Sequence, residues 1–173
     1  MTATLLLWAV LGIDWLGDRG QKATVLLFTR TDCPIANRYA PEVQALAERY
    51  AGRGVEFVLV YPEAGVSEAE FGRHAREYGY RVPVVADPDH RYVRAARAKV
   101  TPEAAVFRQG KLVYRGRIDD RYVRWGTPRG EPTRRDLVAA LDAVLAGRPV
   151  DRKETKTIGC AIEKRSSSPV ANR

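Results

Sequence analysis

The chain has 173 residues, of which 45% are hydrophobic and 29% charged, and its formal net charge is +8. This ordinary globular composition excludes a wholly disordered chain, and the length suits one domain with its own core. The basic residues are mostly arginines spread along the chain, enriched only over residues 129–164. No nucleic-acid-binding motif accompanies them, so we expect no nucleic acid among the partners. Two cysteines are too few for a disulfide scaffold, and they do not fall at zinc-finger spacing with the two histidines.

The first 19 residues form a segment without a clear assignment. Residues 4–12 are apolar but far too short to cross a bilayer, and they lack the basic start and the cleavage site of a signal peptide. They are either the remnant of an export signal or an N-terminal strand, and we expect no transmembrane segment. The rest divides into one domain, residues 20–149, and a basic, largely flexible tail, residues 150–173, which carries Cys160.

Short buried strands alternate with helices through the first half of the domain. Apolar runs predict strands over residues 23–28, 55–61 and 82–86. Helical spacing predicts helices over residues 34–50, 67–78 and 91–98, and Ser67 with Glu70 forms a capping box at the start of the second. This alternation predicts an α/β sheet covered by helices on both faces.

The second half of the chain has a different pattern. Residues 104–108 and 111–115, separated by Gln109-Gly110, predict a β-hairpin. Residues 133–136 predict the start of a last helix that runs to about residue 146. In the tail, residues 157–162 form an apolar island around Cys160, which is either a second reactive thiol or part of a patch that docks the tail.

Cys33 stands between the first predicted strand and the helix that follows it. Backbone N–H groups at the start of a helix have no partner within the helix, and they stabilise an anion there. The thiolate is the reactive form of cysteine, so this position favours a nucleophile over the alternative, an inert core residue. Asp32 opposes the thiolate while Arg30 and Arg38 favour it, and the sequence leaves their net effect open.

The order of the elements and the residues around Cys33 resemble the thioredoxin fold. Pro41 follows Cys33 by eight residues, as the proline inside the first active-site helix of thioredoxins does. Thr101-Pro102, directly before the predicted hairpin, resembles the cis-proline loop that faces the active site in that fold. The two elements inserted before this loop are similar to those of the redoxin branch, which includes TlpA-like proteins and relatives of alkyl hydroperoxide reductase and thiol-specific antioxidant.

Residues 31–42, 114–120 and 159–162 together look like a bacterial redoxin-domain subgroup, and the resemblance covers about residues 20–162. It implies a thioredoxin-like fold with a central mixed sheet and an oxidoreductase that needs no cofactor. Its partners would be a protein or small-molecule disulfide and an external thiol reductant, and a homodimer is a further expectation. The family suggests an extracytoplasmic location, whereas the missing signal peptide leaves the cytoplasm as the alternative.

Three departures from the family patterns bear on the chemistry. Ala36 stands where thioredoxins have the second cysteine of Cys-x-x-Cys, and Leu27 stands where they have a buried proton-transfer aspartate. Arg30 occupies the place of the threonine that orients the peroxide in peroxiredoxins, with Thr29 and Thr31 out of register. Cys33 therefore lacks its usual local partners, and Cys160 is the remaining thiol that can resolve its oxidised form.

The other candidate residues lie near Cys33 in sequence or in the implied fold. Asn37 is one helical turn from Cys33, and the resemblance puts the loop after the hairpin close to the cis-proline side of the site. The predicted catalytic residues are Cys33 and Cys160, and the predicted substrate-contacting residues are Asp32, Pro34, Asn37, Thr101, Pro102, Asp119 and Asp120. His74 is predicted to be a surface residue and His90 part of a helix start, and no metal site is predicted.

Four functions remain open on these grounds. We favour thiol–disulfide exchange because Thr101-Pro102 is kept and the peroxide-orienting threonine is not. The alternatives are a peroxiredoxin-like peroxide reductase, a protein that handles Cu(I) through Cys33 and Cys160, and a redoxin module that only binds partners.

Overall fold

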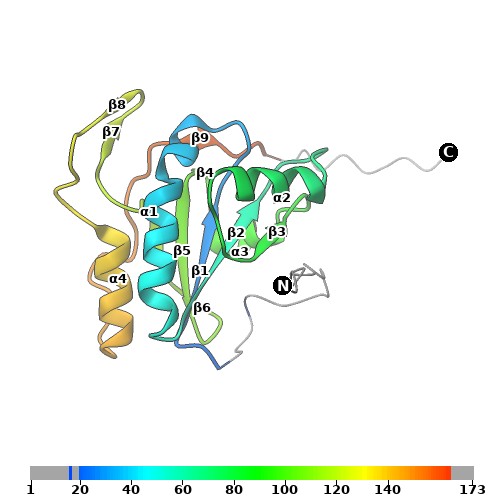
Figure 1. The fold of residues 1–173 in the computed structure, drawn as a ribbon. Coiled ribbons are helices and arrows are strands. Elements are labelled where there is room, and N and C mark those ends of the chain that lie inside the picture. The colour runs from blue at the N-terminus through cyan, green and yellow to red at the C-terminus, as the bar shows by residue number, and fades with distance from the viewer. Residues whose placement is uncertain (1–15, 17–19, 165–173) are drawn as a thin grey trace, which may run out of the picture.

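The computed structural model describes residue 16 and residues 20–164, and the predictions for the other N-terminal residues and for residues 165–173 lie outside the described residues. A five-stranded sheet in the order β3-β2-β1-β5-β6 forms its centre (Figure 1). The strands of this sheet are β1 (Ala23–Phe28), β2 (Val55–Tyr61), β3 (Val84–Ala86), β5 (Glu103–Arg108) and β6 (Lys111–Gly116).

The sheet is mixed, with β1, β2 and β3 parallel to one another and β5 antiparallel to both β1 and β6. The parallel strands read as nearly continuous apolar runs because helices cover both of their faces. The hairpin between β5 and β6 turns at Gln109 and Gly110, which have φ angles of 49° and 71°. Two successive positive φ values give the turn the twist that a tight hairpin needs.

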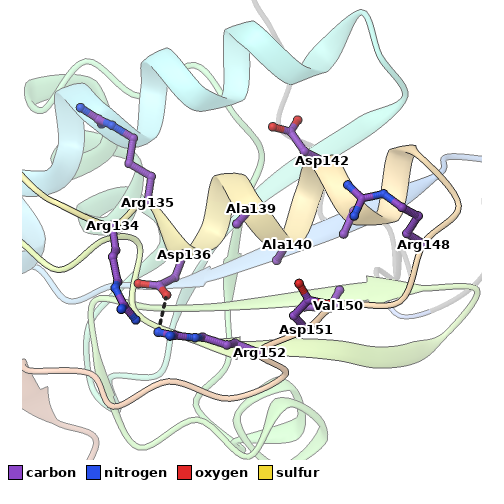
Figure 2. A pocket seen from close by; sticks show the side chains of 11 residues that line it. Arg134, Arg135, Asp136, Ala139, Ala140, Asp142, Arg148, Val150, Asp151 and Arg152 are labelled. Carbon is purple, nitrogen blue, oxygen red and sulfur yellow. Dashed lines mark ion pairs between the residues drawn. The ribbon is translucent and has the colours of Figure 1, made fainter.

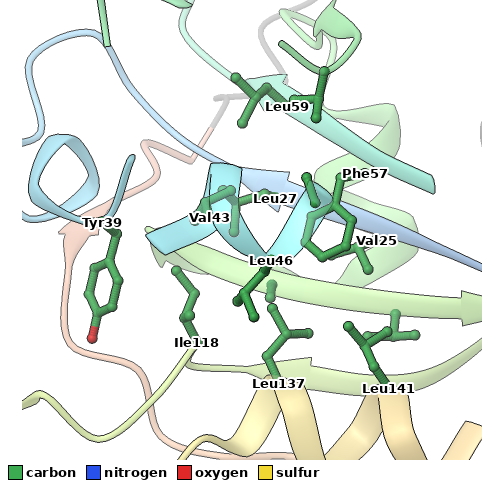
Figure 3. Packing of buried hydrophobic residues seen from close by; sticks show 14 of the residues in the cluster. Val25, Leu27, Tyr39, Val43, Leu46, Phe57, Leu59, Ile118, Leu137 and Leu141 are labelled. Atoms are coloured by element: carbon green, nitrogen blue, oxygen red, sulfur yellow. The ribbon is translucent and has the colours of Figure 1, made fainter. Parts of the chain in front are cut away.

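Four helices cover the sheet, namely α1 (Pro34–Ala51), α2 (Glu68–Glu77), α3 (Arg91–Ala96) and α4 (Asp136–Leu145). Alternate residues of β1 and β2 form one apolar cluster with residues of α1, α2 and α4, and Figure 3 shows Leu27 beside Val43 of α1 and Leu137 of α4 beside Leu46. The opposite set, including Phe28, packs on α3. The period of two along each strand thus separates two apolar clusters, and the predicted cover on both faces is confirmed.

The helices α2 and α4 differ in how their first turns are capped. The capping box of α2 is present, because Ser67 accepts from the backbone N–H of Glu70 and the Glu70 side chain accepts from the N–H of Ser67. The last helix, α4, begins at Asp136, within the predicted start at residues 133–136, and its N-cap residue Arg135 makes no side-chain capping bond. Thr133 donates to Asp120 instead, at 2.5 Å.

Two small antiparallel pairs lie outside the central sheet: β4 (Val100–Thr101) with β9 (Cys160–Ala161), and β7 (Tyr122–Arg124) with β8 (Thr127–Pro128). The β4–β9 pair lies at the same end of the molecule as the start of α1 (Figure 1). The tail therefore runs back from α4 to this end, and its described part, residues 150–164, lies against the domain. The described tail residues thus have contacts with the domain, and the flexibility of the tail stays a prediction.

Candidate redox-active site

Cys33 is the N-cap residue of α1, and Pro34 occupies the first helical position. Pro34 suits this place because the first N–H of a helix has no partner within the helix. The backbone N–H of Asn37 donates to the carbonyl of Cys33 at 2.9 Å and closes the first turn. Cys33 itself is completely buried, with an exposed fraction of 0%.

Cys33 forms a disulfide with Cys160, 127 residues further along the chain, and their Cα atoms are 6.0 Å apart. The Thr101-Pro102 peptide bond is cis, and the sulfur of Cys33 lies 3.1 Å from the carbonyl oxygen of Thr101. Thr101 also pairs with Cys160 between β4 and β9. The fold thus brings together four of the predicted site residues from three distant parts of the sequence.

Two glycines let the tail approach the domain this closely. A Cβ atom on Gly159 would lie 2.2 Å from the carbonyl oxygen of Thr101. A Cβ atom on Gly116, the last residue of β6, would lie 2.0 Å from the side chain of Thr155 and 2.8 Å from its carbonyl oxygen. Any side chain at either position would push the tail away from the cis-proline loop or from β6.

Hydrogen bonds hold the tail along its whole path to Cys160. Arg115 of β6 donates its backbone N–H to Lys153 at 2.9 Å and pairs its guanidinium with Glu154. Beyond the disulfide, the N–H of Ile162 donates to the carbonyl of Lys99 at 2.9 Å. Because contacts precede and follow Cys160, its position opposite Thr101 does not depend on the disulfide alone.

Arg30 connects the loop before Cys33 with the tail. Its guanidinium makes two hydrogen bonds to the exposed carboxylate of Asp32, at 3.0 and 3.2 Å, and a third to the carbonyl of Ala161 at 3.2 Å. The residue that replaces the peroxiredoxin threonine therefore pairs with the acid next to Cys33 and contacts the residue after Cys160. Asp32 contacts this arginine rather than Cys33, and a role towards substrate remains a prediction.

A chain of buried polar side chains supports the same loop from the other side. The hydroxyl of Tyr61 lies 2.7 Å from Nδ1 of His74, and Nε2 of His74 lies 3.0 Å from Oδ1 of Asn37. The amide nitrogen of Asn37 donates to the carbonyl of Thr31 at 3.2 Å, two residues before Cys33. The prediction that His74 is a surface residue is wrong, because its side chain is buried between α2, β2 and α1.

Burial lowers the pKa of His74, since the imidazolium loses its hydration while Glu77 nearby offsets only part of that cost. The neutral ring suits its neighbours, with one nitrogen accepting from Tyr61 and the other donating to Asn37. Sequence reasoning missed this role because it depends on three elements that meet only in the folded protein.

Asp119 and Asp120 are bonded within their own loop and to α1. Asp119 accepts from the hydroxyl of Tyr39 at 2.5 Å and from the N–H of Arg121 at 2.9 Å. Asp120 accepts from the side chain and the N–H of Thr133, and these bonds lower the pKa of Asp120 to about 2. Both therefore shape the loop, and their action on a substrate remains a prediction.

Two buried threonine hydroxyls lie at strand ends, Thr29 in the chain four residues before Cys33 and Thr101 next to the cis-peptide bond. Thr29 follows β1, Thr101 ends β4, and neither Oγ1 atom has a hydrogen-bond partner within residues 20–164. A buried hydroxyl without a partner costs free energy, so each of these hydroxyls is a donor that remains available for a polar atom within its reach. In the sequence, Thr29 drew attention only because it lies one position before the place of the peroxide-orienting threonine of peroxiredoxins.

Two surface pockets lie near the tail. One, with a volume of about 540 Å³, is beside the cysteine loop, and its walls include Arg30, Glu63 and residues 162–164 of the tail. The other, of about 460 Å³, lies between α4 and residues 148–152, and Figure 2 shows Arg152 paired with Asp136 across it. Only the first contains residues that contact the cysteine loop.

The described residues include no cluster of three or more histidines, cysteines and acids that suits a metal ion. None of the helices in the described part is long and apolar enough to cross a membrane.

The chain matches the model of the AhpC/TSA family over residues 14–118. Among solved structures, an uncharacterized conserved protein from Geobacillus kaustophilus is 34% identical, with a TM-score of 0.71 and coverage of 84% of this chain and 79% of that one. A hypothetical protein from Sinorhizobium meliloti 1021 is 29% identical, with a TM-score of 0.70 and coverage of 82% and 79%.

A thioredoxin-like protein from Porphyromonas gingivalis, 18% identical with a TM-score of 0.55 and coverage of 75% and 78%, shares the fold. None of the curated proteins matches the chain. The predicted family and fold are confirmed by these similarities. The chain belongs to the AhpC/TSA family of redoxins and has the thioredoxin-like fold.

Proposed function

We propose that this protein is a thiol–disulfide oxidoreductase that cycles between a Cys33–Cys160 disulfide and the two free thiols. The observation that carries the proposal is the pairing of these cysteines beside the cis-peptide bond of Thr101-Pro102. The pairing supplies the second thiol that Ala36 fails to provide. The contacts of residues 153–155 with β6 keep the tail on the domain and Cys160 within reach of Cys33, which supports repeated closure of the same bond.

In the first step, the thiolate of Cys33 attacks one sulfur of a substrate disulfide. A bond forms between Cys33 and that sulfur, the substrate S–S bond breaks, and the other substrate sulfur leaves as a thiolate. The unpaired N–H groups at the start of α1 stabilise the attacking anion. The thiol of Cys33 also has the carbonyl of Thr101 within reach as a hydrogen-bond acceptor, at 3.1 Å.

In the second step, the thiolate of Cys160 attacks the sulfur of Cys33. The Cys33–Cys160 bond forms, and the remaining substrate sulfur leaves as a thiolate that takes a proton from water. The substrate has gained two electrons and the protein has lost two. An external thiol must then reduce the protein disulfide before the next turnover.

Non-reducing peptide mapping of the reduced protein tests this cycle. After a disulfide substrate is added, we expect Cys33 and Cys160 to appear in one cross-linked peptide pair. The Cys160→Ser variant should stop at a mixed disulfide between Cys33 and the substrate, whereas Cys33→Ser should form no Cys33–Cys160 bond and lose turnover. A wild-type protein that reacts with no disulfide faster than a model thiol peptide would contradict the proposal and favour a partner-binding module.

Peroxide reduction is the second candidate, and the partnerless hydroxyls of Thr29 and Thr101 favour it. Such donors orient a peroxide so that the Cys33 thiolate attacks one oxygen, the O–O bond breaks and an alcohol or water leaves. The Cys33 sulfenic acid then condenses with Cys160 and releases water. If peroxide oxidises the reduced protein at least tenfold faster than any disulfide does, this assignment replaces the first.

A further inference from the structure

We propose that the hairpin of β7 and β8 is the docking surface for the polypeptide that carries the substrate disulfide, and that this polypeptide is acidic and places an apolar side chain against Trp125. This inference deepens the proposed function and rests on it, because it names the class of substrate. Three observations on the hairpin support it: the exposed apolar side chains at its tip, the charge of its arginines, and the packing of its base on α1 near Cys33.

The tip of the hairpin exposes apolar surface. Val123 is 47% exposed and Trp125 is 58% exposed, and among the described residues only Tyr78 is a further large hydrophobic residue on the surface. Trp125 lies in the turn between Arg124 and Thr127, which pair with each other, so it stands where the chain reverses. Tryptophan is enriched among the residues that contribute most to binding at protein interfaces, because its large ring is apolar while its N–H still donates. The tip therefore offers an anchor for an apolar side chain of a partner.

The hairpin and its connection to α4 are strongly basic. Residues 121–135 contain five arginines and only one acidic residue. Arg129 and Arg135 are paired with acids of the domain. Arg124, next to Trp125, is exposed and has no ion pair within the part of the chain that the structure describes. Opposite charges speed the encounter of two proteins and like charges across an interface cost free energy, so an acidic partner fits this surface and a basic one is rejected.

The base of the hairpin packs on the helix that begins next to Cys33. The rings of Tyr122 and Tyr39 have their centroids 5.7 Å apart, and the guanidinium carbon of Arg121 lies 5.9 Å from the centre of the Tyr39 ring. Tyr39 follows Cys33 by six residues, which corresponds to about 9 Å along a helix axis. Figure 1 also shows the hairpin at the end of the molecule where α1 begins. A polypeptide bound to the hairpin therefore has its neighbouring residues within reach of the cysteine site.

The structure of the hairpin favours an extended polypeptide over an anionic membrane surface. The strands β7 and β8 form a sheet of their own, so the outer edge of each has no strand beside it within the described residues. An extended chain can pair its backbone with such an edge, whereas lipids cannot extend a sheet. A segment that binds a membrane surface buries a whole apolar face, and the tip has only two exposed large apolar side chains.

Two synthetic peptide disulfides of opposite charge test the proposal on the full-length protein. Each peptide has one disulfide and one leucine, flanked by glutamates in the first and by lysines in the second, and an external dithiol drives turnover. At low ionic strength, kcat/KM should be about tenfold higher for the glutamate peptide, and added salt should reduce this preference. Equal values, or a preference for the lysine peptide, overturn the inference while turnover leaves the proposed function intact. Turnover of neither peptide and of no neutral aryl disulfide overturns the proposed function itself.

Substitutions at the tip test the anchor. Trp125→Ala should lower kcat/KM for the glutamate peptide about tenfold, mainly through a higher KM, because truncation of an aromatic anchor removes binding free energy. The loss with the neutral aryl disulfide should be much smaller, since this substrate is too small to contact the tip and Cys33 together. Trp125→Phe keeps an aromatic ring and should retain most of the activity. Equal losses with both substrates would show that Trp125 acts through the fold and would contradict docking at the tip.

A charge reversal at Arg124 separates the charge of the hairpin from the net charge of the protein. Arg124→Glu should lower kcat/KM for the glutamate peptide and raise it for the lysine peptide, by about fivefold each. Lys111→Glu is the matched control, because it changes the net charge equally at an exposed residue where β6 starts, at the opposite end of the sheet (Figure 1), and it should leave both values unchanged. The same shift in both variants would overturn the hairpin as the docking surface. Sedimentation of the wild type but not of Trp125→Ala with phosphatidylglycerol vesicles, together with equal turnover of the two peptides, would assign the hairpin to a membrane surface instead.

Discussion

Gly159 shows how a single residue without a side chain decides whether the two cysteines meet. A Cβ atom at this position would meet backbone, the carbonyl oxygen of Thr101 at 2.2 Å, and backbone cannot rotate away as a side chain does. At Gly116 the backbone of Thr155 is similarly close. The tail is therefore positioned by two points at which the main chains touch.

The substitution Gly159→Ala should weaken the Cys33–Cys160 disulfide. We expect its equilibrium constant against glutathione to fall by about tenfold or more, corresponding to about 1.4 kcal/mol, because the tail must shift to admit the methyl group. Gly52→Ala is the matched control, since a Cβ atom at Gly52 meets nothing within 4 Å. Equal equilibrium constants in the two variants would show that the tail does not need this close approach.

The neutral state of His74 should make the stability of the protein depend on pH. Burial lowers the pKa of His74 in the folded state, so below the unfolded value of about 6.5 the unfolded chain binds more protons than the folded one. The contribution of His74 to stability is therefore present above that pH and is lost as the pH falls towards the lowered pKa. The free energy of unfolding in urea, compared between pH 7.5 and pH 5.5, should fall more in the wild type than in His74→Gln.

The glutamine in that variant retains a donor towards Asn37 and does not titrate. Equal losses in the two proteins would show that groups other than His74 cause the pH dependence. The sequence placed this histidine on the surface, because a single polar residue within a helical pattern carries no mark of what packs against it. Cys33 and Thr101-Pro102, by contrast, were identified because their local neighbours mark a helix start and a turn before a hairpin.

Among the elements, the tail is held in two parts that differ in their dependence on the disulfide. Residues near Thr155 are fixed on β6, where the N–H of Thr155 donates to Arg115 at 3.1 Å and its hydroxyl lies 2.9 Å from that of Tyr114. The β4–β9 pair has only two residues in each strand. Such a short pair draws much of its stability from the covalent bond at its centre.

Reduction should therefore release the second part of the tail and leave the first in place. In hydrogen exchange, we expect the amide of Ile162, which donates to Lys99, to exchange at least tenfold faster in the reduced protein. The amide of Thr155 is the internal control and should keep its protection. Unchanged protection at Ile162 would mean that the apolar contacts of the tail hold it without the disulfide.

The main elements were predictable because each is specified by its own residues. The strands β1 and β2 are uniform apolar runs, and the start of α2 is marked by its capping box. The β4–β9 and β7–β8 pairs were missed because two or three residues carry no measurable alternation. The start of α4 at Asp136 was predictable to within a few residues, but the bond of the Thr133 hydroxyl to Asp120 was not, because the two residues meet only in the folded protein.

Across the protein as a whole, the disulfide joins the start of the domain to the end of the described chain. A bond between residues separated by 127 positions removes much of the freedom of the unfolded chain, and loop-closure entropy gives it a value of about 5 kcal/mol. Residual structure in the unfolded chain reduces this value. The sheet and its helices have their own core, so the domain should stay folded when the bond is absent.

The free energy of unfolding measured in urea should thus be larger for the oxidised wild type than for Cys160→Ser, by about 3 to 5 kcal/mol. The control is the same pair in excess reductant, where the difference should shrink to the small effect of replacing one partly buried sulfur. Equal free energies of unfolding for the oxidised wild type and the variant would mean that the disulfide does not restrict the unfolded chain enough to stabilise the fold. The fold class and family were predictable from the order of elements, whereas this long closure was not, because sequence does not say whether two distant thiols meet.

The pairing of Thr101 with Cys160 also has a consequence for the number of residues in the tail. Side chains alternate between the two faces of a strand, so a slip of one position turns every one of them to the other face. Thr155 is held on β6, and the Cys160 side chain must point at Cys33 to form the disulfide. The four residues between Thr155 and Cys160 therefore determine which residue of the tail pairs with Thr101. One residue inserted there that shifted β9 by one position against β4 would keep both thiols in the chain, yet it would turn Cys160 to the face of β9 away from Cys33.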